Sequence, residues 1–149
     1  MNLAQLNIAR LLAPIDSPQI AEFVAQLDPI NALAEHSNGF VWRLKDDSGN
    51  ATDINPFGDD FMIVNMSVWE NLDVLKDFVF RTAHAQVMRD RAKWFEKHLT
   101  PYMVLWWVSE GHIPTVEEAQ ERLTHLQQHG DSPYAFTFKV RYDADGRLV

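Results

Sequence analysis

Apolar and polar residues alternate along several short segments of the chain and recur at helical spacing along the segments between them. Over residues 3–12, Leu6 and Ile8 lie on one side and Gln5 and Asn7 on the other. This period of two is typical of a strand with one face toward the protein interior. The same strand therefore has one purely apolar side and one side that carries two amides.

Capping residues mark where the helical segments begin. Ser17 followed by Pro18 favours a helix N-terminus, and Thr115 with Glu118 forms the sequence pattern of a capping box. In chain order the pattern predicts a strand over 3–12, a helix over 17–35 that Pro29 kinks or restarts at Asp28, strands over 40–45 and 61–69, a helical segment over 70–98 broken near Thr82, a strand over 102–108, a helix over 115–129 and a short strand over 135–142.

This order of elements predicts the fold class. It is βαββαβ with an added helix and a short strand, which is the ferredoxin-like arrangement of helices on an antiparallel sheet. The segment from Asp46 to Asp60 is rich in turn residues and is too long for a simple hairpin, so it is a candidate for a lid. We therefore predict a single α+β domain over residues 1–149.

The two faces of the third predicted strand differ in character. One face is uniformly apolar and suits packing under the helices: Met62, Val64, Met66 and Val68. The other mixes aromatic, aliphatic and polar side chains: Phe61, Ile63, Asn65, Ser67 and Trp69. A mixed face suits the inside of a homodimer in which two sheets face each other and enclose a cavity.

Composition and charge exclude several classes of function. The formal net charge is −8 and no lysine or arginine cluster is present, so we expect no nucleic-acid partner. Without cysteine there are no disulfides and no thiolate chemistry, which fits a reducing cytoplasm. The start of the sequence lacks a signal-peptide pattern, and no apolar run approaches the ~20 residues of a membrane helix. We expect a cytoplasmic protein with no membrane partner.

Aromatic and amide side chains predict a pocket. Four of the five tryptophans fall within residues 65–115, and we expect Trp42, Trp69 and Trp106 to line a cavity. Asn7, Asn65 and Ser67 share one sheet face in the predicted register. They either supply directional hydrogen bonds to a ligand or pair with one another, with water or with a dimer partner.

His84 is the best candidate for chemistry. It is followed at helical spacing by Met88, Arg91 and Phe95, so it has an apolar and a cationic neighbour on its own face. A neutral imidazole there could act as a general base or as a metal or haem ligand. The alternative is a histidine that bonds a backbone carbonyl between helix and sheet.

Other titratable groups carry weaker signals. His112 follows the strand over 102–108 and could swing over a cavity mouth or satisfy loop carbonyls. Arg91 could recognise a carboxylate, although acidic residues are interleaved with the arginines around it. His125 and His129 have the i, i+4 spacing of a chelating pair but no third ligand nearby, so we predict no metal site.

Nearly the whole chain resembles a bacterial family known as domain of unknown function 3291, in the dimeric α/β-barrel superfamily. The segments that carry the resemblance are LAQLNIARL, GFVWRLKDDSGNAT, VNMSVWENLDVLKDFVFRTAH, RAKWFEKH, LWWVSEGHIPTVEEAQERL and AFTF. The resemblance implies a homodimer with facing sheets. It implies no activity.

The chain is also distantly similar to antibiotic-biosynthesis and haem-degrading monooxygenases. The haem degraders use an asparagine on the first strand, with a tryptophan and a histidine on the second helix. Asn7 matches the asparagine, and His84 resembles the histidine at a shorter spacing. Phe78 stands in place of the tryptophan and lacks its N–H. The resemblance makes Asn7 and His84 candidate catalytic residues and haem a candidate cofactor.

Three hypotheses follow from these patterns. The first is a monooxygenase-like or isomerase-like enzyme that acts on an aromatic or polycyclic substrate in a cavity between sheet and helices. The second is a protein that binds haem or another hydrophobic small molecule without transforming it. The third is a structural dimer whose aromatic residues fill the interface.

Overall fold

The computed structural model of this protein describes residues 1–45 and 59–149. Its elements are β1 (Asn2–Arg10), the 3₁₀ turn η1 (Pro18–Ile20), α1 (Ala21–Glu35), β2 (Phe40–Arg43), β3 (Met62–Trp69), α2 (Leu72–Arg81), α3 (His84–Arg89), the 3₁₀ turn η2 (Arg91–Lys93), β4 (Met103–Val108) and α4 (Val116–His129). The predicted lid spans Asp46 to Asp60, and residues 46–58 of it lie outside the described residues.

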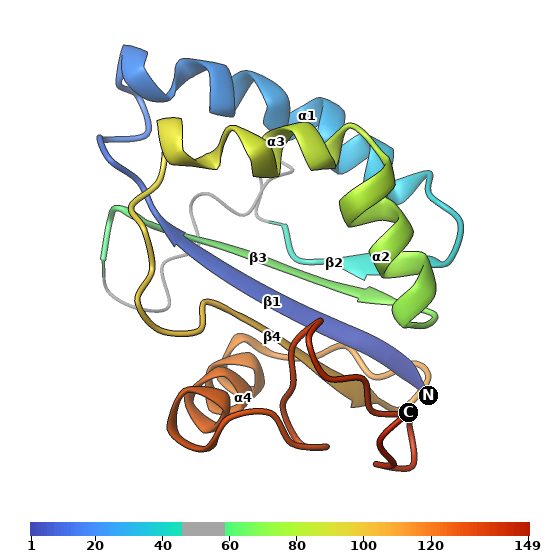
Figure 1. The fold of residues 1–149 in the computed structure, drawn as a ribbon. Helices are drawn as coiled ribbons and strands as arrows, with labels where there is room; N and C mark the ends of the chain where they lie inside the picture. The colour runs from blue at the N-terminus through green and yellow to red at the C-terminus, as the bar shows by residue number, and fades with distance from the viewer. Residues whose placement is uncertain (46–58) are drawn as a thin grey trace.

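The four strands form one antiparallel sheet in the order β2-β3-β1-β4 (Figure 1). β1 is central: Gln5 lies opposite Ser67 of β3 and Leu105 of β4, and Asn7 lies opposite Asn65. This order, with helices connecting the strands, is the ferredoxin-like topology. The predicted α+β fold is confirmed.

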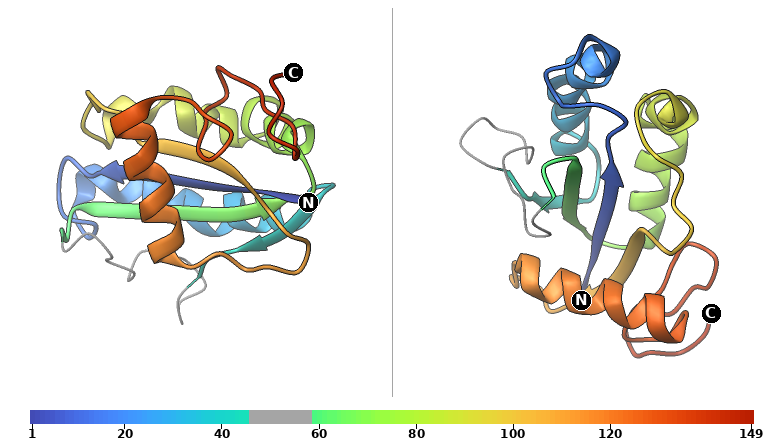
Figure 2. Two further views of the ribbon diagram at one scale, coloured as in Figure 1. Left: turned by 90° about the horizontal axis from the view of Figure 1, so that it is seen from below. Right: turned by 90° about the vertical axis from the view of Figure 1, so that its left-hand side faces the viewer.

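Helices cover both faces of the sheet. α1, α2 and α3 lie on one side and α4 crosses the other (Figures 1 and 2). The uniformly apolar strand face packs against α4, through Ala119, Leu123 and Leu126. The mixed face, with Asn65 and Ser67, lies toward α1, α2 and α3.

The apolar face packs under a helix as predicted, whereas the mixed face, which we expected to face a partner's sheet, lies under α1, α2 and α3. Met66 is 1% exposed and Val104 and Trp106 are 0% exposed within one chain, because α4 packs on them directly. Neither face is left open to meet a partner's sheet in the way we expected. The homodimer itself stays a prediction.

Capping residues start the helices where the sequence predicts. The Ser17 hydroxyl accepts a hydrogen bond from the Gln19 backbone N–H, and the Thr115 hydroxyl accepts one from that of Glu118. The break near Thr82 is confirmed, since that residue is extended and separates α2 from α3. α1 continues through Pro29, so the predicted restart at Asp28 is wrong.

The end of the chain is less regular than predicted. The expected strand over 135–142 is reduced to isolated bridges, and in one of them Leu105 and Phe136 exchange backbone hydrogen bonds of 2.7 and 2.9 Å. The fold keeps the added helix and only a trace of the added strand. No helix in the described part of the chain combines the length and apolar character needed to cross a bilayer.

Among the glycines that the structure describes, Gly39 is the one where a side chain is least tolerated. Its φ is +83°, and an added Cβ would lie 2.6 Å from Cγ2 of Val74 in α2. We expect Gly39→Ala to lower the free energy of unfolding by about 2–4 kcal/mol, from backbone strain and overpacking together. Gly111 is the matched control, because it has the same φ with open space around it. Urea unfolding of both variants checks this, and an equal loss in the two would show that α2 yields.

Candidate functional site

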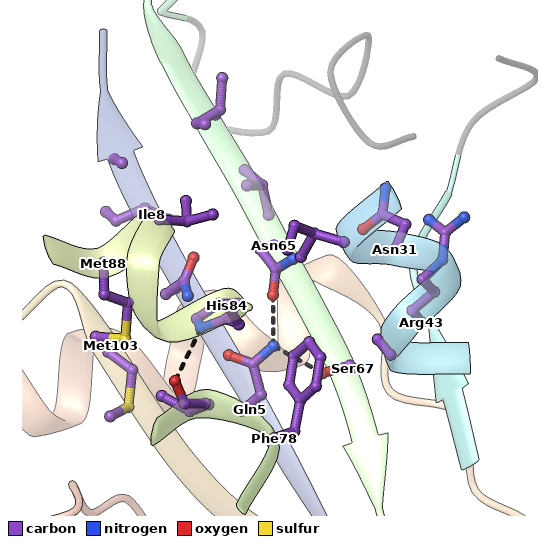
Figure 3. Close-up of a pocket in the computed structure, with 18 of the residues that line it drawn as sticks. Gln5, Ile8, Asn31, Arg43, Asn65, Ser67, Phe78, His84, Met88 and Met103 are labelled. Carbon is purple, nitrogen blue, oxygen red and sulfur yellow. Dashed lines mark hydrogen bonds between the residues drawn. The ribbon is translucent and has the colours of Figure 1, made fainter. Parts of the chain in front are cut away.

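A cavity of about 290 Å³ lies between the mixed face of the sheet and the helices α1, α2 and α3 (Figure 3). Side chains of β1 and β3 form its floor, and apolar residues of the helices, such as Leu27, Ile30 and Val87, form its walls. The location agrees with the hypothesis of a cavity between sheet and helices.

A chain of hydrogen bonds crosses the floor of this cavity. Nε2 of Gln5 donates to Oδ1 of Asn65 at 2.6 Å and to Oγ of Ser67 at 2.8 Å. The indole Nε1 of Trp69 also donates to Oγ of Ser67, at 2.8 Å. Gln5 and Ser67 are each 7% exposed, so these bonds offset the cost of burying their polar atoms. We call these four residues the floor network.

Two amides of the floor remain open to a ligand. Asn65 is an exposed residue although it lies in the middle of β3, because the cavity reaches its side chain. Asn7, opposite Asn65 in the register, also lines the cavity, and no described residue bonds its side-chain amide. Polar groups of this kind among apolar walls are typical of small-molecule sites.

His84 begins α3 and lies over the floor (Figure 3). Its Nδ1 lies 3.3 Å from the carbonyl oxygen of Val79, and since a carbonyl can only accept, Nδ1 carries the hydrogen. Nε2 is then the basic nitrogen, and it has no partner in the described part of the chain. Burial lowers the pKa of His84, and the bond to Val79 opposes this only in part.

Aromatic rings join the histidine to the floor network. Phe78 stacks on Trp69 with centroids 5.0 Å apart and an interplanar angle of 27°. The ring centroids of His84 and Phe78 are also 5.0 Å apart, so Phe78 contacts both Trp69 and His84. Phe78 therefore offers packing where an indole would also offer a hydrogen bond.

Two arginines lie at the edges of the cavity, each with a partner. Arg91 donates to the hydroxyl of Tyr102 at 2.9 Å, with its guanidinium carbon 4.4 Å from the centre of that ring. Arg43 forms an ion pair of 2.6 Å with Glu35. Arg91, whose partner is a hydroxyl group, keeps its positive charge near the cavity, whereas the carboxylate of Glu35 neutralises the charge of Arg43.

Seven of the ten residues predicted for the site line this cavity: Asn7, Asn65, Ser67, Trp69, Phe78, His84 and Arg91. Three predicted residues, Trp42, Trp106 and His112, do not line it. Trp42 and Trp106 belong to the apolar layer under α4. Trp106 Nε1 and His112 Nε2 both contact the carboxylate of Glu118, at 2.8 and 2.7 Å. Because β4 is apolar on both faces, its sequence could not show which tryptophan points which way.

Sequence reasoning missed Gln5 and Tyr102 as site residues. Gln5 carried a usable signal, since it alternates with Asn7 on the polar side of β1. Tyr102 carried none, because its contact with Arg91 joins the loop before β4 to η2.

Several solved structures are similar to this chain at low sequence identity. A protein of unknown function from Nitrosomonas europaea has 14% identity and a TM-score of 0.49, over 76% of this chain and 95% of that one. SnoaB, described as a cofactor-independent oxygenase from Streptomyces nogalater, has 16% identity and a TM-score of 0.47, over 76% and 98%. A dabb family protein with a ferredoxin-like fold from Mesorhizobium loti has 15% identity and a TM-score of 0.45, over 74% and 100%.

At these identities the likeness is one of fold and says nothing of activity. None of the curated proteins matches the sequence. The model of one family, described as a domain of unknown function (DUF3291), matches residues 2–149. The match spans all the elements of the fold and the whole floor of the cavity. The chain belongs to this family.

Proposed function

We propose that this protein binds a flat aromatic small molecule in the cavity and removes a proton from it, as the first step of a monooxygenase-like reaction. The observation that carries the proposal is the open Nε2 of His84 above a floor of amides. Apolar walls with a few directed polar groups support the choice of an aromatic ligand.

His84 would act as the general base. Its Nδ1–H is engaged by Val79, which fixes the tautomer and leaves Nε2 as the acceptor. Because burial lowers its pKa, the imidazole is neutral and ready to accept a proton at neutral pH. A histidine that only filled space in a packing layer would not need an unpaired nitrogen at a cavity.

The amides of the floor would stabilise the charge that proton removal creates. If the substrate has an acidic C–H or O–H conjugated to a carbonyl, its oxygen becomes negative when the proton leaves. Asn65 and Asn7 line the cavity with side-chain amides that can donate to such an oxygen. Donors held in place before the reaction stabilise a developing oxyanion without the cost of reorganisation.

The complete reaction can be written for anthrone, a tricyclic ketone with an acidic methylene group. His84 takes one methylene proton, and the resulting enolate gives electrons to O₂, which forms a carbon–oxygen bond at the same carbon. The hydroperoxide recovers the proton from His84, then loses water as the second methylene hydrogen leaves. One anthrone and one O₂ yield one anthraquinone and one water, so the substrate supplies all the electrons.

Haem fits these residues poorly. His84 would supply a ligand to the iron through Nε2, and Arg91 would pair with a carboxylate of the haem. The second arginine of the cavity, Arg43, is already neutralised by Glu35. A cavity of about 290 Å³ also lies at the small end of ligand pockets, whereas haem is a large ligand. We expect a haem titration to leave the Soret band of free haem unchanged; a saturable shift that His84→Ala abolishes would contradict this.

Oxygen consumption with anthrone tests the proposal. We expect the purified protein to accelerate O₂ uptake and the formation of anthraquinone in equal amounts, above the spontaneous rate at the same pH. Trp106→Phe provides a matched control, because that residue lies on the other side of the sheet. If the protein binds anthrone without accelerating its oxidation, the second hypothesis, passive binding, is favoured instead.

A further inference from the structure

We propose that Gln5 sets the polarity of the cavity floor and thereby selects ligands that present a hydrogen-bond acceptor, such as a ketone or phenolate oxygen. The inference rests on the proposed ligand cavity and deepens it, because it names the ligand chemistry and the residue that determines it. Gln5 acts through Asn65 and is a positioning residue.

The buried position of Gln5 in the sheet restricts the hydrogen-bond partners that its side-chain amide can reach. It lies in the central strand β1, between Ser67 of β3 and Leu105 of β4, and is 7% exposed. A primary amide nitrogen has two hydrogens, and both are used: one on Asn65 and one on Ser67. The amide oxygen of Gln5 is left turned away from both partners (Figure 3).

The orientation of Gln5 determines that of Asn65. Oδ1 of Asn65 accepts from Gln5 at 2.6 Å, so Nδ2 occupies the other branch of the same amide. No described residue bonds Nδ2, and the side chain is exposed to the cavity. Asn65 therefore offers N–H groups to a ligand, whereas its acceptor atom is already engaged.

Ser67 and Trp69 complete the hydrogen bonds of the floor network. An indole N–H can only donate, so the bond from Trp69 occupies one acceptor position of the Ser67 hydroxyl. The N–H of Gln5 occupies the second. The two bonds together use both acceptor positions of the Ser67 hydroxyl, which joins Gln5 and Trp69 in one network.

Three flat ring systems of similar size can serve as probes of the polarity of the cavity floor. 9-Fluorenone presents an acceptor, carbazole presents an N–H donor, and fluorene presents neither. For the unmodified protein, we expect equilibrium dialysis to show fluorenone bound about tenfold more tightly than carbazole, with fluorene as the apolar reference. Carbazole should bind more weakly because its N–H would face an N–H of Asn65, and neither group can accept a hydrogen bond.

Two variants of Gln5 separate its polarity from its volume. Gln5→Glu has no N–H when ionised, so Asn65 must turn its nitrogen toward the new carboxylate and offer its oxygen to the cavity. We expect the preference to reverse in favour of carbazole. Gln5→Met removes both donors at similar volume, and we expect the preference to fall to within about twofold. A fluorenone preference that is unchanged in both variants would overturn the inference.

A measurement without any ligand covers the case in which a variant does not fold or no probe binds. In the unmodified protein, we expect NMR to show slow hydrogen exchange for the side-chain amide of Gln5 and fast exchange for that of Asn65. The opposite order would mean that both amides are rotated, and the inference would be wrong. Failure of all three probes, with the expected exchange, would count against the proposed function and leave the polarity of the floor established.

Discussion

Replacement of His84 by asparagine is expected to lower the turnover of anthrone by about 10²–10⁴-fold, the usual contribution of a general base. Asparagine keeps a nitrogen donor for the Val79 carbonyl but has no basic nitrogen to replace Nε2. The fold should therefore survive, with an unchanged melting temperature. Steady-state O₂ uptake together with thermal unfolding measures both effects.

The best control for this variant is His36→Asn. His36 also bonds a backbone carbonyl through Nδ1, at 2.7 Å from Ala32, but it is an exposed residue at the end of α1. It should leave the turnover unchanged. Loss of stability in His84→Asn without a specific loss of turnover would show that His84 is a packing residue and would contradict the proposed function.

The pH dependence of the reaction follows from the same residue. A general base works in its unprotonated form, and burial lowers the pKa of His84 below its ordinary value. The rate should therefore rise as the pH increases through this lowered pKa and should already be level at neutral pH. His84→Asn should lack this step, whereas His36→Asn should retain it.

Trp106→Ala is expected to cause the largest loss of stability, about 3–5 kcal/mol in the free energy of unfolding. The side chain is 0% exposed, lies between β4 and α4, and donates its indole N–H to Glu118. Alanine would leave a cavity between the sheet and α4 and remove one partner of a partly buried carboxylate. Urea unfolding at neutral pH measures the loss.

Trp106→Phe separates the two contributions. It keeps a ring in the same layer but removes the N–H, so the loss should be smaller, with about 1 kcal/mol due to the hydrogen bond. Fluorenone affinity should be the same in both variants, since the cavity lies on the opposite face of the sheet. A loss below about 1 kcal/mol for alanine would show that α4 contributes little to holding the sheet.

The sequence was sufficient to predict the order of the elements and most of the site. Alternation identified the polar side of β1, and strand pairing puts Asn7 opposite Asn65, so that both residues line the cavity. The helical spacing after His84 predicts that Arg91 lies on the same side, and both residues line the cavity.

The sequence could not show which helix packs on which face. The rule that an apolar strand face packs under helices is correct, but the helix is α4, whose apolar stripe fits the sheet directly. The mixed face tolerates Gln5, Asn7 and Asn65 because a cavity separates it from α1 and α3. The size of such a cavity depends on the distance between the sheet and the helices, and no local sequence pattern determines that distance.

The position of α4 has a consequence for how binding relates to association. α4 lies on one face of the sheet, and the cavity lies on the opposite face. We therefore expect ligand affinity not to depend on assembly. A dissociated protomer at low concentration should hold its ligand as tightly as the same protomer in an oligomer.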